Sequence, residues 1–129
     1  MSAYSDFPKI IAVCCVIGWA MYQFKSRSDE TLKYENGAPI RTGETENYLN
    51  NGVWTWYHEN GEIQITGDFV KGKREGLWKS FDTLGNLMIE SHYKNNMMDG
   101  DFIQYSPDGI IIRHDLYKED QLIKQLPID

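Results

Sequence analysis

The chain has 129 residues, a net charge of −6 and 41% hydrophobic residues. This length suits one domain, and the composition is that of a globular chain rather than a disordered segment. Asp and Glu outnumber Lys and Arg by 19 to 13, which argues against a nucleic-acid-binding domain, since such a domain needs basic surface to neutralise phosphates. The two cysteines, Cys14 and Cys15, are adjacent, so they cannot form the disulfide framework of a small secreted fold.

An apolar segment lies near the N-terminus. Residues 7–24 contain one charged side chain, Lys9, close to the start of the segment, and Lys25 and Arg27 follow its end. In a helix these residues would span roughly 27 Å, which matches the hydrocarbon core of a thin bilayer. We therefore predict a transmembrane anchor helix over residues 7–24, which makes the protein a single-pass membrane protein.

Other interpretations of this segment remain open. Gly18-Trp19-Ala20 resembles the small-residue cleavage pattern of a signal peptide, a lipoprotein signal could end at Cys14, and a buried core helix is a further alternative. Basic residues flank the segment on both sides, so the positive-inside rule gives only a slight preference for the extracytoplasmic side as the place of the chain that follows.

A period of 24 residues governs the chain from Gly52 onward. Five columns recur in three consecutive copies without an insertion: Gly52, Gly76 and Gly100; Trp54, Trp78 and Phe102; Tyr57, Phe81 and Tyr105; Gly61, Gly85 and Gly109; Phe69, Tyr93 and Tyr117. Residues 34–51 form an imperfect earlier copy, because Asn36-Gly37 precedes Asn60-Gly61 by one period. A fixed period with degenerate terminal copies is typical of a repeat protein in which each unit packs on its neighbour.

The pattern within each copy predicts a β-hairpin. Asn60-Gly61 and Asp108-Gly109 supply the positive φ angles of tight hairpin turns. After the first of these turns, residues 63–69 alternate between apolar or small residues and polar residues, as in a strand with one buried face. The third copy departs from this alternation, with Arg113 and Asp115 in place of an isoleucine and a glycine. We predict an all-β fold, one antiparallel β-meander of six or seven strands preceded by the N-terminal helix.

The spacing Gly-x-Trp-x-x-Tyr-x-x-Asn-Gly, followed by Phe-x-x-Gly-x-x-x-Gly, resembles the MORN repeat in its variant class, over about 75 to 90 of the 129 residues. The resemblance implies hairpins stacked side by side in one elongated sheet, with the Trp54 column and the Tyr57 column each stacked along it. The domain organisation that we expect is a tail (1–6), the anchor (7–24), a juxtamembrane linker (25–33), a degenerate capping repeat (34–51), three repeats (52–123) and a C-terminal tail (124–129).

The sequence offers little that would support catalysis. The histidines His58, His92 and His114 occupy different columns, and none has a cysteine or second histidine at metal-ligand spacing. Residues 99–101 lack the alternating acidic ligands and closing glutamate of a calcium loop. Neither a glycine-rich phosphate loop before a helix nor a nucleophile with a base is recognisable. We expect no enzymatic activity, no cofactor and no metal site.

These features favour a membrane-anchored protein–protein interaction module, a scaffold or an accessory subunit of a membrane complex, whose protein partner is itself membrane-bound. The resemblance implies one alternative, because many proteins of the variant MORN class are labelled antitoxin or immunity proteins that neutralise one toxin. Binding of anionic lipid is disfavoured, because residues 52–124 carry 12 acidic and 8 basic residues. Nucleic acid is excluded as a partner by the same acidic balance.

The end of the chain is the predicted docking site for the partner. The outer strands of an open sheet carry unpaired N–H and C=O groups that can pair with another chain. Residues 121–126 can form one more strand before Pro127, with Leu122, Lys124 and Leu126 on one side and Ile123 on the other. We expect a partner strand, or a second copy of the chain in a homo-oligomer, to dock there by strand addition.

Overall fold

The computed structural model describes residues 32–128. The predicted tail (1–6), the predicted membrane anchor (7–24) and most of the predicted linker (25–33) lie outside these residues. No segment of residues 32–128 forms a helix of the length and apolar character that crossing a bilayer requires.

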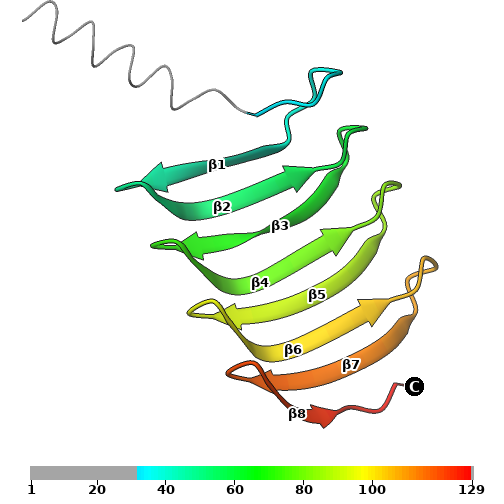
Figure 1. Cartoon of the computed structure of the whole chain (residues 1–129). Helices are drawn as coiled ribbons and strands as arrows, with labels where there is room; N and C mark the ends of the chain where they lie inside the picture. Colours follow the sequence, from blue (N-terminus) through cyan, green and yellow to red (C-terminus); the bar gives the residue numbers. More distant parts are fainter. Residues whose placement is uncertain (1–31, 129) are drawn as a thin grey trace, which may run out of the picture. The chain divides into compact units, whose positions relative to one another are not determined.

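The described residues form one antiparallel sheet of eight strands in chain order, which Figure 1 shows side by side. The strands are β1 (Arg41–Glu46), β2 (Leu49–Tyr57), β3 (Ile63–Val70), β4 (Lys73–Phe81), β5 (Leu87–Lys94), β6 (Met97–Tyr105), β7 (Ile111–Lys118) and β8 (Gln121–Gln125). The predicted all-β meander is confirmed. It has more strands than expected because the degenerate copy contributes β1 and the chain end contributes β8, which takes in Lys124 and Gln125 of the expected tail.

The tight turns lie at the opposite end of the strands from the one that we expected. Two-residue turns with positive φ at both positions join the strands of each hairpin: Asn47-Tyr48, Lys71-Gly72, Asn95-Asn96 and Glu119-Asp120. This is the type I′ geometry whose twist matches the flanking strands. Asn60-Gly61 lies instead in the longer connection of residues 58–62, in which the positive φ predicted for Gly61 is confirmed (88°). There the Gly61 N–H donates to the His58 carbonyl (2.9 Å) and closes a wider turn.

The core of this single-layer sheet consists of tryptophan lying on glycine. Trp54 and Trp78 are only 6% and 7% exposed. A Cβ atom added at Gly43 would come within 2.2 Å of the Trp54 ring, and one added at Gly67 would come equally close to Trp78. The indoles of Trp54 and Trp78 therefore each lie flat on the preceding strand, in space that only a glycine leaves free. A sheet without a second layer can bury a large ring in this way.

The buried rings are linked through other aromatic residues rather than stacked directly on one another. Phe69 lies between the two tryptophans, with edge-on contacts at centroid distances of 6.2 Å to Trp54 and 5.1 Å to Trp78. Tyr93 continues the row, 6.1 Å from Trp78. Trp56, which the repeat pattern did not reveal, lies 5.9 Å from each of the two buried rings. The Trp54 column is therefore not stacked along the sheet as the resemblance implied: within residues 32–128 its two tryptophans meet through Phe69 and Trp56, and Phe102 pairs with Tyr117 instead.

The Tyr57 column faces the other side of the sheet. Register shifts precede Tyr57, Phe81 and Tyr105 alike. The Tyr57 hydroxyl lies 3.2 Å from Thr42 Oγ1, and the Tyr105 hydroxyl donates to Glu90 Oε2 (2.8 Å). The two tyrosines of this column therefore bond to the neighbouring strand, and within residues 32–128 the ring stacking that the resemblance implied does not occur between Tyr57, Phe81 and Tyr105.

Candidate protein-binding surfaces

The C-terminal edge of the sheet is strand β8. Within residues 32–128 it pairs with β7 alone. Leu122 pairs with Tyr117 and Lys124 pairs with Leu116, so Ile123 is the extra residue of a bulge. Because Leu116 and Tyr117 are consecutive, they point to opposite faces. Leu122 and Lys124 therefore do not share one side of the strand, and the sequence-based assignment of faces in β8 is wrong.

The surface around this edge is apolar. Leu122 and Ile123 are 48% and 58% exposed. Ile110, Ile111 and Ile112 are exposed as well, but they lie at the start of β7 and in the connection before it, away from the residues Asp115–Lys118 that pair with β8. Leu126, the last of the predicted edge residues, is half-buried and donates its N–H to the His114 carbonyl (2.8 Å), one residue beyond β8. The edge thus combines a strand that has no outer neighbour in residues 32–128 with two exposed aliphatic side chains on that strand, Leu122 and Ile123.

A buried carboxylate lies beneath this edge. Asp115, in the column of Gly67, is 1% exposed, and its Oδ1 has no hydrogen-bond partner among residues 32–128. Its Oδ2 accepts a hydrogen bond from Arg113 Nε (2.6 Å), and this carboxylate raises the pKa of the Arg113 guanidinium. The same guanidinium lies over the Phe102 ring, 5.3 Å from its centre. A charged cluster thus replaces the tryptophan-on-glycine core at the C-terminal end.

The second surface is the row of connections at the other end of the strands from the two-residue turns (Figure 1). Asparagine side chains bridge the first connections of this row. Asn36 Nδ2 donates to the Glu59 carbonyl (2.6 Å), and Asn60 Nδ2 donates to the Thr83 carbonyl (2.7 Å). Each asparagine also accepts a bond inside its own connection, since Asn60 Oδ1 bonds the Glu62 N–H (3.1 Å). Asn60, a residue we had assigned only to a turn, therefore joins successive hairpins.

A second set of bridges runs beside the asparagines. The Tyr34 hydroxyl donates to the Tyr57 carbonyl (2.9 Å). One period later, His58 Nε2 lies 3.0 Å from the Phe81 carbonyl. His58 is thereby held as a structural bridge at the end of strand β4, which gives a non-catalytic reason for its position.

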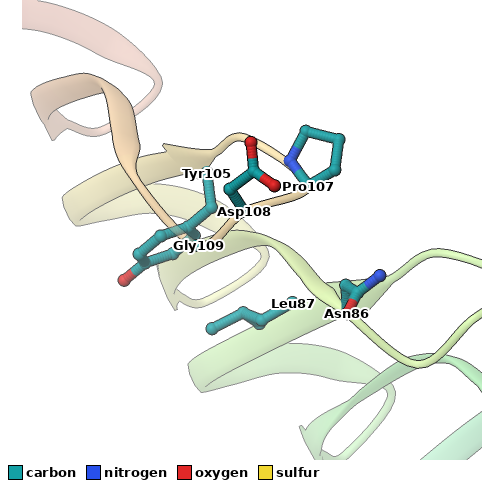
Figure 2. Close-up of a pocket in the computed structure, with 6 residues that line it drawn as sticks. All are labelled: Asn86, Leu87, Tyr105, Pro107, Asp108 and Gly109. Carbon is teal, nitrogen blue, oxygen red and sulfur yellow. The ribbon is translucent and has the colours of Figure 1, made fainter.

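The row changes at the third connection. Asp82 Oδ1 accepts from the N–H groups of Leu84 (2.8 Å) and Asn86 (2.9 Å), so this connection is closed by its own side chain. Leu84 stands in the asparagine column and is 82% exposed. An open pocket of about 310 Å³ lies between this connection and the next, and Figure 2 shows Asn86 and Leu87 on one side of it and Tyr105, Pro107, Asp108 and Gly109 on the other.

The family comparison agrees with this architecture. Residues 50–71 and 74–95 each match the MORN repeat variant. Over these two segments the chain is similar to the MORN repeat variant. The matched MORN copies are the ones that contain Trp54 and Trp78, the residues that build the core. No curated protein matches the chain.

Of the ionisable residues considered from the sequence, the structure brings the side chains of His114 and Asp101 together. His114 Nε2 lies 2.9 Å from Asp101 Oδ1, whereas His92 contacts only the Asp101 carbonyl oxygen, through its Nδ1 at 3.4 Å. Within residues 32–128, no group of three or more His, Cys, Asp or Glu side chains could hold a metal ion. The surfaces that the MORN sheet offers for binding are thus the β8 edge and the row of connections.

Proposed function

We propose that this protein is a membrane-anchored protein-binding module, a scaffold or accessory subunit whose MORN sheet holds a partner protein. The anchor is the apolar segment of residues 7–24. The observation that carries the proposal is the β8 edge, where a strand with no outer neighbour in residues 32–128 exposes the aliphatic side chains of Leu122 and Ile123. Exposed apolar patches next to unpaired strand groups are features that soluble proteins normally avoid.

Strand addition is the binding mode that fits this edge. The main-chain N–H and C=O groups of β8 supply affinity, and the side chains of Leu122, Ile123, Lys124 and Leu126 supply selectivity. The bulge at Ile123 interrupts the regular alternation of the edge. A partner strand therefore has to match this irregular spacing, which restricts pairing to a partner of suitable shape.

A capture experiment with a matched pair of variants tests the proposal. Ile123→Asp places a charge on the edge, and Val53→Asp places one on β2, where Val53 is similarly exposed (62% against 58%). Full-length protein from detergent-solubilised membranes should capture its partner with the Val53 variant and lose it with the Ile123 variant, as judged by mass spectrometry. Equal capture by both variants would contradict docking at β8.

The captured protein then decides between the finer alternatives. A subunit of a membrane complex supports the scaffold or accessory role. A toxin whose activity falls on binding would assign the neutralising function that the resemblance suggested, and a second copy of the chain would assign a homo-oligomer.

A further inference from the structure

The bridges between successive connections stop at the third one. At the first interface, the carbonyls of Tyr57 and Glu59 accept hydrogen bonds from side chains of the preceding connection. At the second interface, the carbonyls of Phe81 and Thr83 are bridged in the same way. One period on, the corresponding carbonyls belong to Tyr105 and Pro107. Among residues 32–128, neither accepts a side-chain hydrogen bond from the preceding connection, because Asp82 and Leu84 replace the two donors.

At the third connection, Asp82 and Leu84 stand where the second has His58 and Asn60. These residues keep the connection closed but do not bridge it to the next one. Asp82 bonds the backbone N–H groups of its own connection, and Ser106 Oγ likewise bonds the Ile110 N–H (3.1 Å) in the next one. Local geometry is therefore kept without the asparagine. The two residues whose carbonyls lack this bridge, Tyr105 and Pro107, both line the pocket (Figure 2).

The lining of this pocket has a defined chemistry. Leu87 and the Tyr105 ring give it apolar walls, and the exposed carboxylate of Asp108 forms no ion pair within residues 32–128. The pocket therefore offers hydrogen-bond acceptors and a negative charge beside apolar surface. A guanidinium group supplies several N–H donors in one plane, carries a positive charge and is weakly hydrated, so that it also packs on apolar and aromatic surface.

We infer that this pocket between residues 82–86 and 106–110 binds an arginine side chain of the partner protein. The inference rests on the proposed protein-binding function and adds a second, polar contact to it. The arginine replaces the two donors that the repeat lacks at this interface, and its charge is attracted by Asp108 and by the net charge of −6. The aliphatic stem of the arginine packs along Leu87, as long cationic side chains do on apolar surface.

The binding test uses full-length, ¹⁵N-labelled protein in detergent micelles, with N-acetyl-arginine amide as the probe. Saturable shifts should be confined to the amides of residues 82–87 and 105–110. N-acetyl-citrulline amide, which keeps the N–H donors but lacks the charge, should bind more weakly. Shifts spread over other connections, or shifts that do not saturate, would overturn the inference.

Two variants make the test specific. Leu84→Asn restores the donor found at Asn60 and should weaken probe binding roughly tenfold, since the Pro107 carbonyl is then occupied. Asp108→Asn should also weaken binding. Asn60→Leu, which removes a bridge at the preceding interface, is the matched control and should leave binding at the pocket unchanged. Undiminished binding by the Leu84 variant would overturn the assignment.

Partner capture separates this inference from the proposed function. Undiminished capture by Leu84→Asn would overturn the arginine pocket while leaving docking at β8 intact. Undiminished capture by Ile123→Asp, together with loss of capture by Leu84→Asn, would overturn docking at β8 and support the pocket.

Discussion

The first four strands and the last four strands of the sheet share one repeat but differ in how they are held together. In β1–β4, Trp54 and Trp78 lie on glycines, and asparagine side chains join the connections. In β5–β8, Ser91 and Asp115 occupy the glycine column, the bridges end, and Leu122 and Ile123 are exposed on the edge strand. The difference predicts that the N-terminal half is the more stable one, and both of the binding surfaces that we propose lie in the C-terminal half.

The largest effect is expected from removing the central ring. Trp78 contacts Trp56, Phe69 and Tyr93, so Trp78→Ala should destabilise the sheet by about 3–5 kcal/mol. The urea midpoint of the full-length protein in micelles measures this change. The matched variant Phe102→Ala removes a ring from the C-terminal half and should cost clearly less. Equal losses would remove the distinction between the two halves.

The glycine column can be tested by exchanging it between the halves. Gly67 lies under the Trp78 ring, and the equivalent position one repeat later is Ser91. Gly67→Ser therefore places a serine under Trp78, and overpacking of this kind should cost about 1–3 kcal/mol. Adding Trp78→Phe should recover part of the loss, because Ser91 and Phe102 already occur together as a cross-strand pair. A double-mutant cycle from urea midpoints gives the coupling. Simple additivity of the two changes would show that ring and glycine do not share space.

The buried carboxylate is expected to make the C-terminal half less stable. Asp115→Ser removes a buried oxygen that has no partner among residues 32–128 and should raise the free energy of unfolding by about 1 kcal/mol, because Arg113 is partly exposed and remains hydrated. Arg113→Met should have the opposite effect, since it leaves the carboxylate unpaired. The same urea titration measures both variants. A destabilising Asp115→Ser would show that the ion pair holds the edge together.

A smaller, pH-dependent effect is expected on the other face. The hydrogen bond from the Tyr105 hydroxyl, with a further contribution from Lys79, lowers the pKa of Glu90 below its ordinary value of 4.5. The ionised carboxylate is therefore favoured by folding, and its contribution is present above pH 4.5 and lost as the pH falls through the lowered pKa. Glu90→Gln should reduce the loss of stability between pH 5 and pH 3. Thermal melts across this range check it, and superimposable pH profiles would contradict it.

The sequence predicts the repeat, the all-β meander and the positive φ of the loop glycines, because each recurs in register with the period. Trp56 was missed because its column continues as Ser80 and Gln104, so comparison of copies hides it. The two-residue turns were missed because their residues differ from copy to copy, Lys71-Gly72 being followed by Asn95-Asn96. The bridge made by Asn60 was hidden because its acceptor is a backbone carbonyl one repeat later, which no residue type marks.

Backbone hydrogen exchange of the full-length protein tests the contrast between the two halves most directly. Local opening is least frequent where packing is densest, so we expect the amides of β2, β3 and β4 to exchange slowest and those of β7 and β8 fastest. Mass spectrometry of the exchanged protein gives this order in a single experiment. Protection in β7 and β8 equal to that in β2–β4 would contradict the division of the sheet into a stable half and a binding half.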